Sequence, residues 1–242
     1  MNDDTSHASL TLETLLPTDA PDGPRKPGRP KGNQSAQTRE RILNAAEQLF
    51  ADRGYDGASI RDVAAEAGLQ VHSIGYHFGP KESLFDAVVA RRAEIMTRLR
   101  RDALEDERAK AGAQAIEVEL LVHAYVEPIL KSASHGDPGW RNYAALMGRL
   151  ANSPLGTEII ARHYDVTARD YIAELNRSLP GADALDVVEG FSAMVAAMLG
   201  ICSATGRPER LSGRATPRDP ERSFETLVRF HTAGFLALAT TQ

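Results

Sequence analysis

The chain has 242 residues and a mass of 26.2 kDa, enough for one or two domains with a sizeable hydrophobic core. Its 42% hydrophobic and 25% charged residues exclude a collagen-like or wholly disordered protein. The longest apolar stretch, residues 191–202, is shorter than the roughly 20 residues of a bilayer span, so we expect no membrane partner. The first 24 residues lack Lys and Arg, unlike a secretory signal, and a lone cysteine cannot form an intrachain disulfide, so we expect a cytoplasmic protein.

The net charge of −5 is unevenly distributed along the chain. Residues 1–24 contribute −5, and residues 99–242 contribute −3 from 16 Lys and Arg against 19 Asp and Glu. Residues 25–98 carry 12 Lys and Arg against 9 Asp and Glu, a local charge of +3. A basic segment of this kind can supply phosphate contacts although the total is acidic, so the charge balance is compatible with a nucleic-acid partner.

Residues 1–34 contain five prolines and no sustained periodicity, so we interpret them as a flexible N-terminal arm. Within the arm, residues 27–30 (Pro-Gly-Arg-Pro) resemble the Gly-Arg-Pro core of an AT-hook, flanked by Arg25 and Lys31. An extended segment with an arginine, here Arg29, suits the narrow minor groove of A·T-rich DNA. The alternative is a charged linker that contacts phosphates without sequence preference.

The following residues predict four helices before about residue 100. The first begins near Ala36 and stops at Gly54, and the second begins after a Ser59 cap with Asp62 three residues later. The third is short, over residues 71–78. The fourth opens at Gly79-Pro80, with the proline in the first helical position, and runs to about Arg100. Its expected buried face consists of Leu84, Phe85, Val88 and Val89.

The rest of the chain also has helical periodicity, interrupted by Gly and Pro. We expect helices near residues 103–110, 114–134, 138–152, 155–178, 183–204 and 219–240. The stretch between Gly206 and Pro220 holds four arginines and is interpreted as a solvated loop. No segment alternates as a half-buried strand does, so the expected fold class is all-α.

Two short helices joined through Ala67-Gly68-Leu69 describe a helix-turn-helix, whose second helix lies in the major groove of DNA. The glycine accepts positive φ and allows the helices to cross steeply. On the second helix only Ile74 and Phe78 are expected to face the core. Packing alone does not explain the polar and aromatic residues that remain for the outer face, which are Val71, His72, Ser73, Gly75, Tyr76 and His77.

At this point the sequence resembles the N-terminal domain of TetR-type bacterial transcriptional regulators. The resemblance covers residues 38–84 and includes residues 38–50 (TRERILNAAEQLF), Gly54-Tyr55, Ser59, Val63-Ala64, Ala67-Gly68-Leu69, Tyr76-His77-Phe78, Lys81 and Leu84. It implies an all-helical homodimer with a three-helix helix-turn-helix domain at residues 35–98. A larger domain at residues 99–242 would then bind a small effector and mediate dimerisation.

The same resemblance implies how the protein holds an operator. It gives phosphate contacts to Ser59, Arg61, Tyr76 and Lys81, with His77 beside them, and the arm adds Arg25, Arg29 and Lys31. It gives a cap position to Gln70 and base-reading positions to Val71, His72 and Ser73. Gly75 departs from the Tyr or Asn of many members, so that contact is absent or replaced by closer backbone approach.

The last part of the chain is the candidate dimerisation and effector domain. The helices near 183–204 and 219–240 are apolar round most of their circumference, so they must be buried on more than one side, and the resemblance implies that they form a four-helix bundle with their dimer mates. Candidate pocket residues are His123, Tyr125, Trp140, Tyr143, Met147, His163, Tyr164, Met194 and Met198, with ordinary core as the alternative for each. The region from Trp140 onward also resembles the fatty-acid-responsive branch, which suggests an acyl or acyl-CoA effector; an aromatic one is the other expectation.

Other functions fit less well. No phosphate-binding glycine loop, nucleophile elbow or His-Glu-x-x-His zinc motif is present, so we expect neither an enzyme nor a bound metal or cofactor. An architectural DNA binder without effector would not need the roughly 140 residues after the DNA-binding domain. The expectation is therefore a ligand-responsive regulator on a pseudo-palindromic operator, in the first instance a repressor, with an activator of the same fold as an alternative.

Overall fold

The computed structural model describes residues 31–135, 138–151, 153–202, 206–213 and 219–239. Within these ranges all regular elements are helices, which confirms the predicted all-α class. In chain order they are α1 (Lys31–Gly57), α2 (Ile60–Glu66), α3 (Val71–Phe78), α4 (Lys81–Ala111), α5 (Val118–His135), α6 (Pro138–Leu150), α7 (Pro154–Ser178), α8 (Ala184–Cys202), α9 (Arg207–Ser212) and α10 (Pro220–Leu238).

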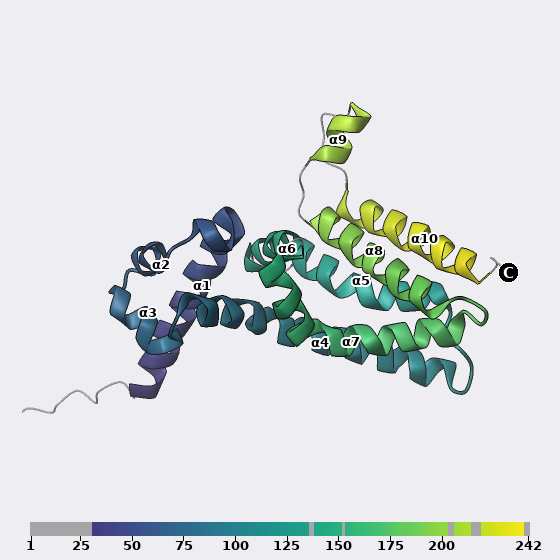
Figure 1. Cartoon of the computed structure of the whole chain (residues 1–242), viewed down its shortest axis with the longest axis horizontal. Coiled ribbons are helices and arrows are strands. Elements are labelled where there is room, and N and C mark those ends of the chain that lie inside the picture. The colour runs from purple at the N-terminus through teal and green to yellow at the C-terminus, as the bar shows by residue number, and fades with distance from the viewer. Residues whose placement is uncertain (1–30, 136–137, 152, 203–205, 214–218, 240–242) are drawn as a thin grey trace, which may run out of the picture.

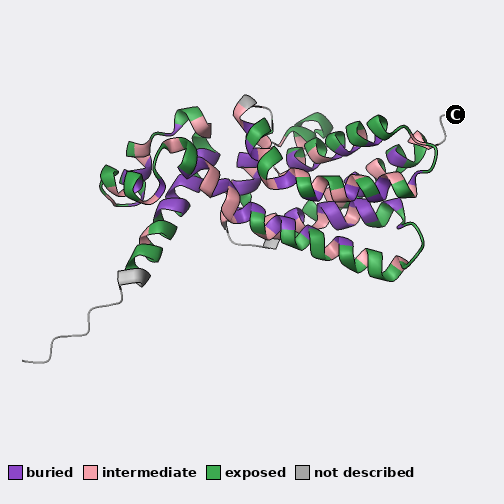
Figure 2. Ribbon diagram, turned by 60° about the horizontal axis from the view of Figure 1, so that its bottom comes forward, coloured by how far each residue is buried: buried purple, intermediate pink, exposed green. Residues whose placement is uncertain are grey.

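The helices form two lobes joined by α4 (Figure 1). Helices α1, α2 and α3 pack with the beginning of α4 in the N-terminal lobe, around a core that includes Phe50, Ile74 and Phe85. Helices α5 to α8 and α10 pack with the remainder of α4 in the C-terminal lobe. Figure 2 shows the buried residues running along the inside of this bundle, with exposed residues on its outside. The core is continuous from one lobe to the other.

The N-terminal lobe follows the sequence prediction closely, with three differences. Helix α1 begins at Lys31, inside the segment expected as an arm. Its backbone is non-helical at Gly54, with φ 73° and ψ 177°, where the sequence predicted the end, but a short further helical piece follows to Gly57. The predicted cap of α2 is present: Ser59 Oγ accepts a hydrogen bond from Asp62 N at 3.2 Å, and Ser59 N donates to Asp62 Oδ2 at 2.9 Å. Pro80 is the N-cap of α4, one residue before the helical position that we expected.

The prediction that α4 stops near Arg100 was wrong. The helix runs without a break to Ala111, and the separate helix expected over 103–110 is its last part. Two features hold this last part of α4 against the rest of the lobe. Leu104 is fully buried, and Arg108 Nε donates to Glu174 Oε1 on α7 at 2.7 Å. Residues 101–111 contain neither Gly nor Pro, so no helix breaker separates the two predicted helices.

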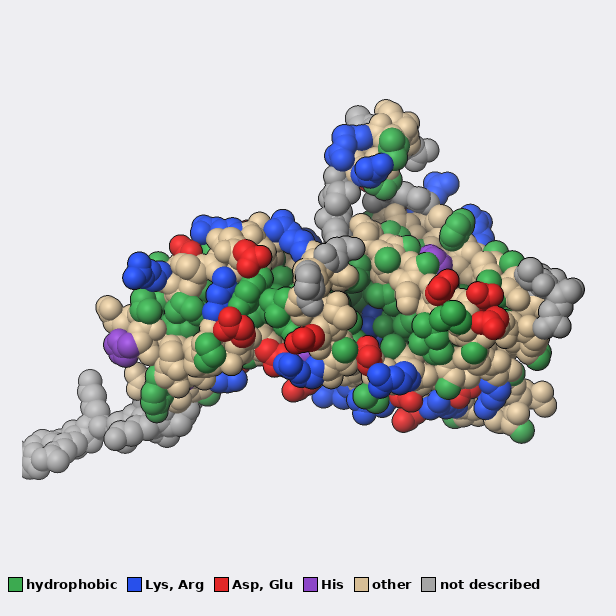
Figure 3. All heavy atoms as spheres, viewed as in Figure 1, with side chains coloured by type: hydrophobic (Ala, Val, Ile, Leu, Met, Phe, Trp, Pro, Cys, Tyr) green, Lys and Arg blue, Asp and Glu red, His purple; other side chains and the backbone are tan. Residues whose placement is uncertain are grey.

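The segment 206–220, expected as a loop, contains the short helix α9 between Gly206 and Gly213, which both have positive φ. Helix α9 projects away from the bundle (Figure 1), and basic side chains gather on it (Figure 3). Its Arg207 and Arg210 are exposed. The other C-terminal helices lie within a few residues of their predicted limits.

Helices α8 and α10 pack side by side and leave apolar residues uncovered within one chain. By length and composition alone, helix α8 could cross a membrane, since the mean hydropathy of its most apolar 18 residues is 1.7. Only 28% of this stretch is buried within the chain. Along its C-terminal half the exposed residues are small: Ser192, Ala193, Ala196, Ala197 and Gly200. Its first turns also expose Leu185 and Val188, together with Asp186 and Glu189. On α10, Phe230 is 73% exposed. One face of this helix pair is therefore open to a further partner.

Candidate functional sites

The turn between α2 and α3 is held from behind by α1. Gly68 has a φ of 62°, and Leu69 N donates to Ala64 O at 2.9 Å, which closes the turn. Arg41 Nη2 donates to the carbonyl of Ala67 at 2.6 Å and, more weakly, to that of Gly68 at 3.5 Å. The turn therefore depends on an arginine of the preceding helix as well as on its glycine.

A second arginine of α1 fixes the end of α3. The guanidinium of Arg39 lies over the ring of Phe78 at 4.1 Å and donates to the carbonyl of His77 at 3.0 Å. Both arginines lie in the family-like segment 38–50, and the sequence predicted no role for them. No signal in the sequence identifies their partners, because both contacts are made to backbone or ring groups more than 25 residues away.

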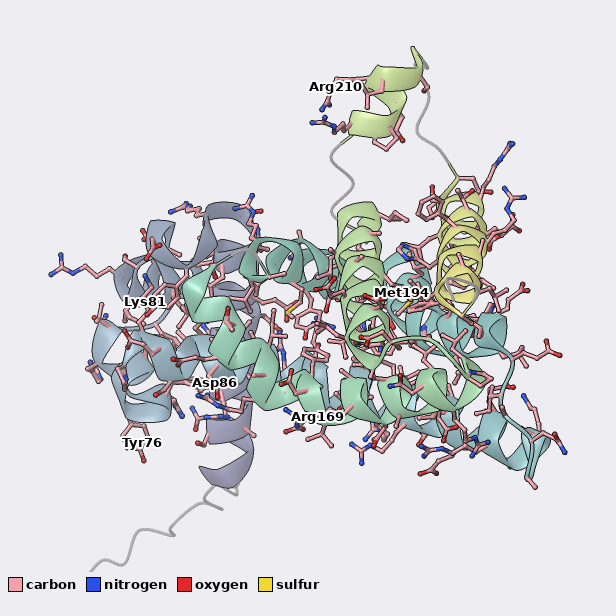
Figure 4. The ribbon with its side chains drawn as sticks, turned by 45° about the vertical axis from the view of Figure 1, so that its right-hand side comes forward. Tyr76, Lys81, Asp86, Arg169, Met194 and Arg210 are labelled. Carbon is pink, nitrogen blue, oxygen red and sulfur yellow. The ribbon has the colours of Figure 1, made fainter. Side chains whose placement is uncertain are left out.

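The outer face of α3 is open, as its sequence predicted. Ile74 and Phe78 are buried, whereas Val71 is 47% and Tyr76 83% exposed. Figure 4 shows Tyr76 projecting away from the lobe. No side chain lies within 4 Å of where a Cβ would stand at Gly75, so a partner can approach the backbone there. His72 is exposed as well, and Ser73 and His77 are partly exposed.

The other expected contact residues lie around this face, and some of their side chains are already bonded within the protein whereas others are exposed. Ser59 Oγ is occupied, since it also donates to Asp62 Oδ2 at 2.6 Å, whereas Arg61 is exposed and Gln70 makes no cap bond with its side chain. Lys81 lies over the ring of Tyr55 at 4.2 Å. Burial, with Glu82 close by, raises the pKa of Tyr55 to about 12. The remaining arm positions, Arg25, Arg29 and the side chain of Lys31, lie outside the described residues.

A buried ionic cluster joins the two lobes. Glu47 of α1 is buried and pairs with two consecutive arginines of α4: Arg92 Nε lies 2.8 Å from Glu47 Oε2, and Arg91 Nη2 also contacts that oxygen. The guanidinium of Arg92 lies over the ring of Trp140 on α6 at 4.8 Å. On the same junction, Arg149 of α6 donates to the carbonyl of Asp52 at 2.9 Å. The two lobes are thus joined by buried ion pairs and hydrogen bonds as well as by apolar packing.

Four tyrosines form a cluster inside the C-terminal lobe. The hydroxyls of Tyr143 on α6 and Tyr164 on α7 hydrogen-bond to each other. Tyr125 on α5 packs edge-on against Tyr171 on α7, with 5.0 Å between ring centroids, and Tyr171 donates to the carbonyl of Arg100 at 2.7 Å. Burial raises the pKa of Tyr164 to about 12 and raises those of Tyr143 and Tyr171 too. All three are therefore neutral at physiological pH.

The structure brings most of the candidate pocket residues into this interior and separates two of them from it. Trp140, Tyr143 and Met147 are buried on α6, and Met194 and Met198 are buried on α8. His123 lies elsewhere, in an open groove of about 1140 Å³ between α5 and α10, where its ring packs against Phe224 at 5.0 Å. His163 faces Asp86 at the beginning of α4, with 3.0 Å between Nε2 and Oδ1.

Comparisons with known proteins cover both lobes. Residues 42–88 match the model of the bacterial regulatory proteins of the tetR family, and residues 123–234 match that of the tetracyclin repressor-like C-terminal domain. The HTH-type transcriptional repressor Rv3405c of Mycobacterium tuberculosis is 32% identical over 174 residues, which cover 71% of this chain and 82% of that protein.

Of two further likenesses, one covers only a short part of the chain and the other concerns the fold. The HTH-type transcriptional repressor AcnR of Corynebacterium glutamicum is 37% identical over 70 residues, which cover 27% of this chain and only 37% of AcnR. The structure of the ketosteroid transcriptional regulator KstR2 of Mycobacterium tuberculosis superposes with a TM-score of 0.56 at 19% identity, over 81% of this chain and 93% of that one. At this identity the likeness concerns the fold alone.

Proposed function

Because the chain belongs to the TetR family of DNA-binding transcriptional regulators, a family without enzymatic activity, we propose that it is a ligand-responsive repressor of a pseudo-palindromic operator. Relatives such as Rv3405c and AcnR are named as repressors. The observation that carries the proposal is the exposed face of α3, with Val71 and Tyr76 open to a partner while Arg39 and Arg41 hold the helix from behind. Such a rigid, outward-facing short helix suits the major groove.

Within this proposal the contact residues divide into two groups. Arg61, Tyr76 and Lys81 contact phosphates, together with the basic arm, and fix the orientation of α3. Ser59 takes part by capping α2, since both its hydroxyl and its backbone N–H are bonded to Asp62. Val71, His72 and Ser73 read base edges from the first turn of α3.

The active species in this proposal is a homodimer built on α8 and α10. The small exposed residues of α8 permit close approach of a second helix, and Phe230 supplies a large exposed apolar side chain on α10. An exposed apolar face of this kind indicates a protein partner. Phe230→Asp is expected to convert the dimer to monomer in sedimentation velocity, whereas Val166→Asp, at an exposed valine of α7, leaves it intact.

The direct test is fluorescence anisotropy of the full chain on the DNA upstream of its own gene and on a scrambled duplex, over a series of salt concentrations. We expect tight binding to the native duplex alone, weakening with salt as several phosphate contacts require. Val71→Ala removes two methyl groups from the base-reading face and is expected to weaken operator binding about tenfold while leaving the scrambled duplex unaffected.

The matched control is Val166→Ala, at a valine that is 66% exposed on α7 and remote from α3. It is expected to leave both affinities unchanged. Equal binding of both duplexes at every salt concentration would favour the alternative function, an architectural DNA binder that needs no effector.

A further inference from the structure

Arg100 lies at the centre of the C-terminal lobe and is only 3% exposed. Its Nε donates to the carbonyl of Tyr125 at 2.9 Å, and its Nη2 contacts Met198 Sδ at 3.6 Å. A guanidinium carries five N–H donors. These two contacts use two of them and leave three without a hydrogen-bond partner in the described part of the chain.

The charge of Arg100 has no counter-ion among the described residues. The other arginines of α4 that reach into the protein are paired, Arg92 with Glu47 at 2.8 Å and Arg108 with Glu174 at 2.7 Å. Around Arg100 stand aromatic rings instead: its guanidinium lies over Tyr125 at 3.9 Å and 5.8 Å from the ring centroid of Tyr164. A buried charge without an anion is costly, and buried charges in proteins are normally paired.

The neighbouring hydroxyls do not supply the missing negative charge. Burial raises the pKa of Tyr143, Tyr164 and Tyr171, so these phenols stay neutral. They remain hydrogen-bonding groups, and Tyr143 and Tyr164 satisfy one another across α6 and α7. The surroundings are otherwise apolar, including Phe191, which packs on Tyr125, and the flexible side chain of Met198.

We propose that the effector is an organic carboxylate, and that Arg100 binds its carboxylate in the tyrosine-lined core while its acyl or aryl body lies among the apolar side chains. This rests on the proposed function, in which the C-terminal lobe binds the effector. A guanidinium offers two parallel donors that match a carboxylate. A single negative charge neutralises Arg100, whereas a phosphate dianion would leave one uncompensated negative charge in the same core.

The experiment uses octanoate and benzoate with their amides, octanamide and benzamide, as neutral probes of the same shape. Binding to the full chain is followed by the fluorescence of Trp140, the single tryptophan, whose ring lies 5.9 Å from that of Tyr143. We expect at least one acid to bind at least tenfold more tightly than its amide. The acid that binds shows whether the body is alkyl or aryl.

Arg100→Met is expected to weaken binding of that acid about 10- to 100-fold, as loss of a charge-assisted hydrogen bond predicts, and to leave the amide unchanged. Arg101→Met, at the exposed neighbouring arginine, is the matched control and keeps full affinity. Arg100→Met should also melt no lower than the wild type without ligand, since it removes an unpaired buried charge. Arg100→Lys keeps the positive charge but lacks the two parallel donors of the guanidinium. An affinity for the acid between those of wild type and Arg100→Met supports the same assignment.

The inference is overturned if neither acid binds, if acid and amide bind equally, or if Arg100→Met binds the acid normally. Operator anisotropy separates this result from the proposed function. A compound that releases operator equally well from wild type and from Arg100→Met would support the proposed ligand-responsive regulator. It would refute the assignment of Arg100 as the carboxylate site.

Discussion

The ionic cluster at the junction of the lobes predicts a large effect from a small change. Glu47 has a side chain that is 3% exposed, and it pairs with Arg92, whose side chain is 9% exposed, and with Arg91. Glu47→Gln keeps the shape of the side chain and removes its charge, so the buried ion pairs of Glu47 with Arg92 and Arg91 are lost. Removing one partner of a buried ion pair costs about 3–5 kcal/mol, against about 0–1 kcal/mol for an exposed pair.

We expect a loss of about 3 kcal/mol in the free energy of unfolding, at the lower end of this range, because glutamine keeps one oxygen that accepts from Arg92. For a chain of this size such a loss lowers the melting temperature by roughly 6–12 °C. The assay is thermal unfolding followed by Trp140 fluorescence and by helical circular dichroism, at one protein concentration because the protein is expected to be a dimer.

Glu40→Gln is the control, because Glu40 contacts the same Arg91, at 3.3 Å, but has a side chain that is 61% exposed. It is expected to cost less than about 1 kcal/mol. Equal shifts for the two variants, or no shift for Glu47→Gln, would refute the reasoning. The second outcome would mean that desolvation of the charges already cancels their attraction.

Three further results are expected. Arg41→Met should weaken operator binding about tenfold in the anisotropy assay, because the carbonyls of Ala67 and Gly68 lose their donor; unchanged affinity would show that the turn holds without it. Stability should fall between pH 10 and 12, because burial raises the pKa of Tyr164 to about 12 while an unfolded tyrosine loses its proton near pH 10, so the unfolded state binds fewer protons there; a melting temperature that rises over this interval would contradict it. Burial raises the pKa of the Cys202 thiol to about 11, so alkylation by iodoacetamide at pH 8 should be slow in the native protein and fast in urea, and equal rates would show an accessible thiol.

The sequence predicts the DNA-binding lobe well because its signals are local. The limits of α3 agree with the prediction at both ends, and the cap formed by Ser59 and Asp62 is present, since each depends on residues only a few positions apart. The prediction fails where a long-range contact decides. Helix α4 continues to Ala111 because Leu104 is buried by packing and Arg108 meets Glu174, 66 residues away.

The candidate ligand residues show the same limit at the level of single side chains. His123 and Tyr125 stand two positions apart on α5, and residues at that spacing do not share a helix face, so His123 faces α10 while Tyr125 faces the core. Arg100 was missed because Arg98 and Arg101 stand beside it, and a run of arginines is normally interpreted as a solvated surface. Only the three-dimensional arrangement shows that Arg98 and Arg101 are exposed while Arg100 is buried.

Helix α4 gives the two proposals a common physical basis. It carries Phe85 in the core of the N-terminal lobe, Arg92 at the junction and Arg100 in the tyrosine cluster. At 1.5 Å per residue, the 15 residues from Phe85 to Arg100 span about 22 Å of one continuous helix.

A carboxylate bound at Arg100 changes DNA affinity only if it favours one of two positions of this helix over the other, and the same preference must appear as weaker ligand binding when operator is present. The Glu47–Arg92–Trp140 contacts are where such a shift must be accommodated, because they attach α4 to α1 on one side and to α6 on the other. Glu47→Gln should therefore alter the coupling between acid and operator, whereas Glu40→Gln should not.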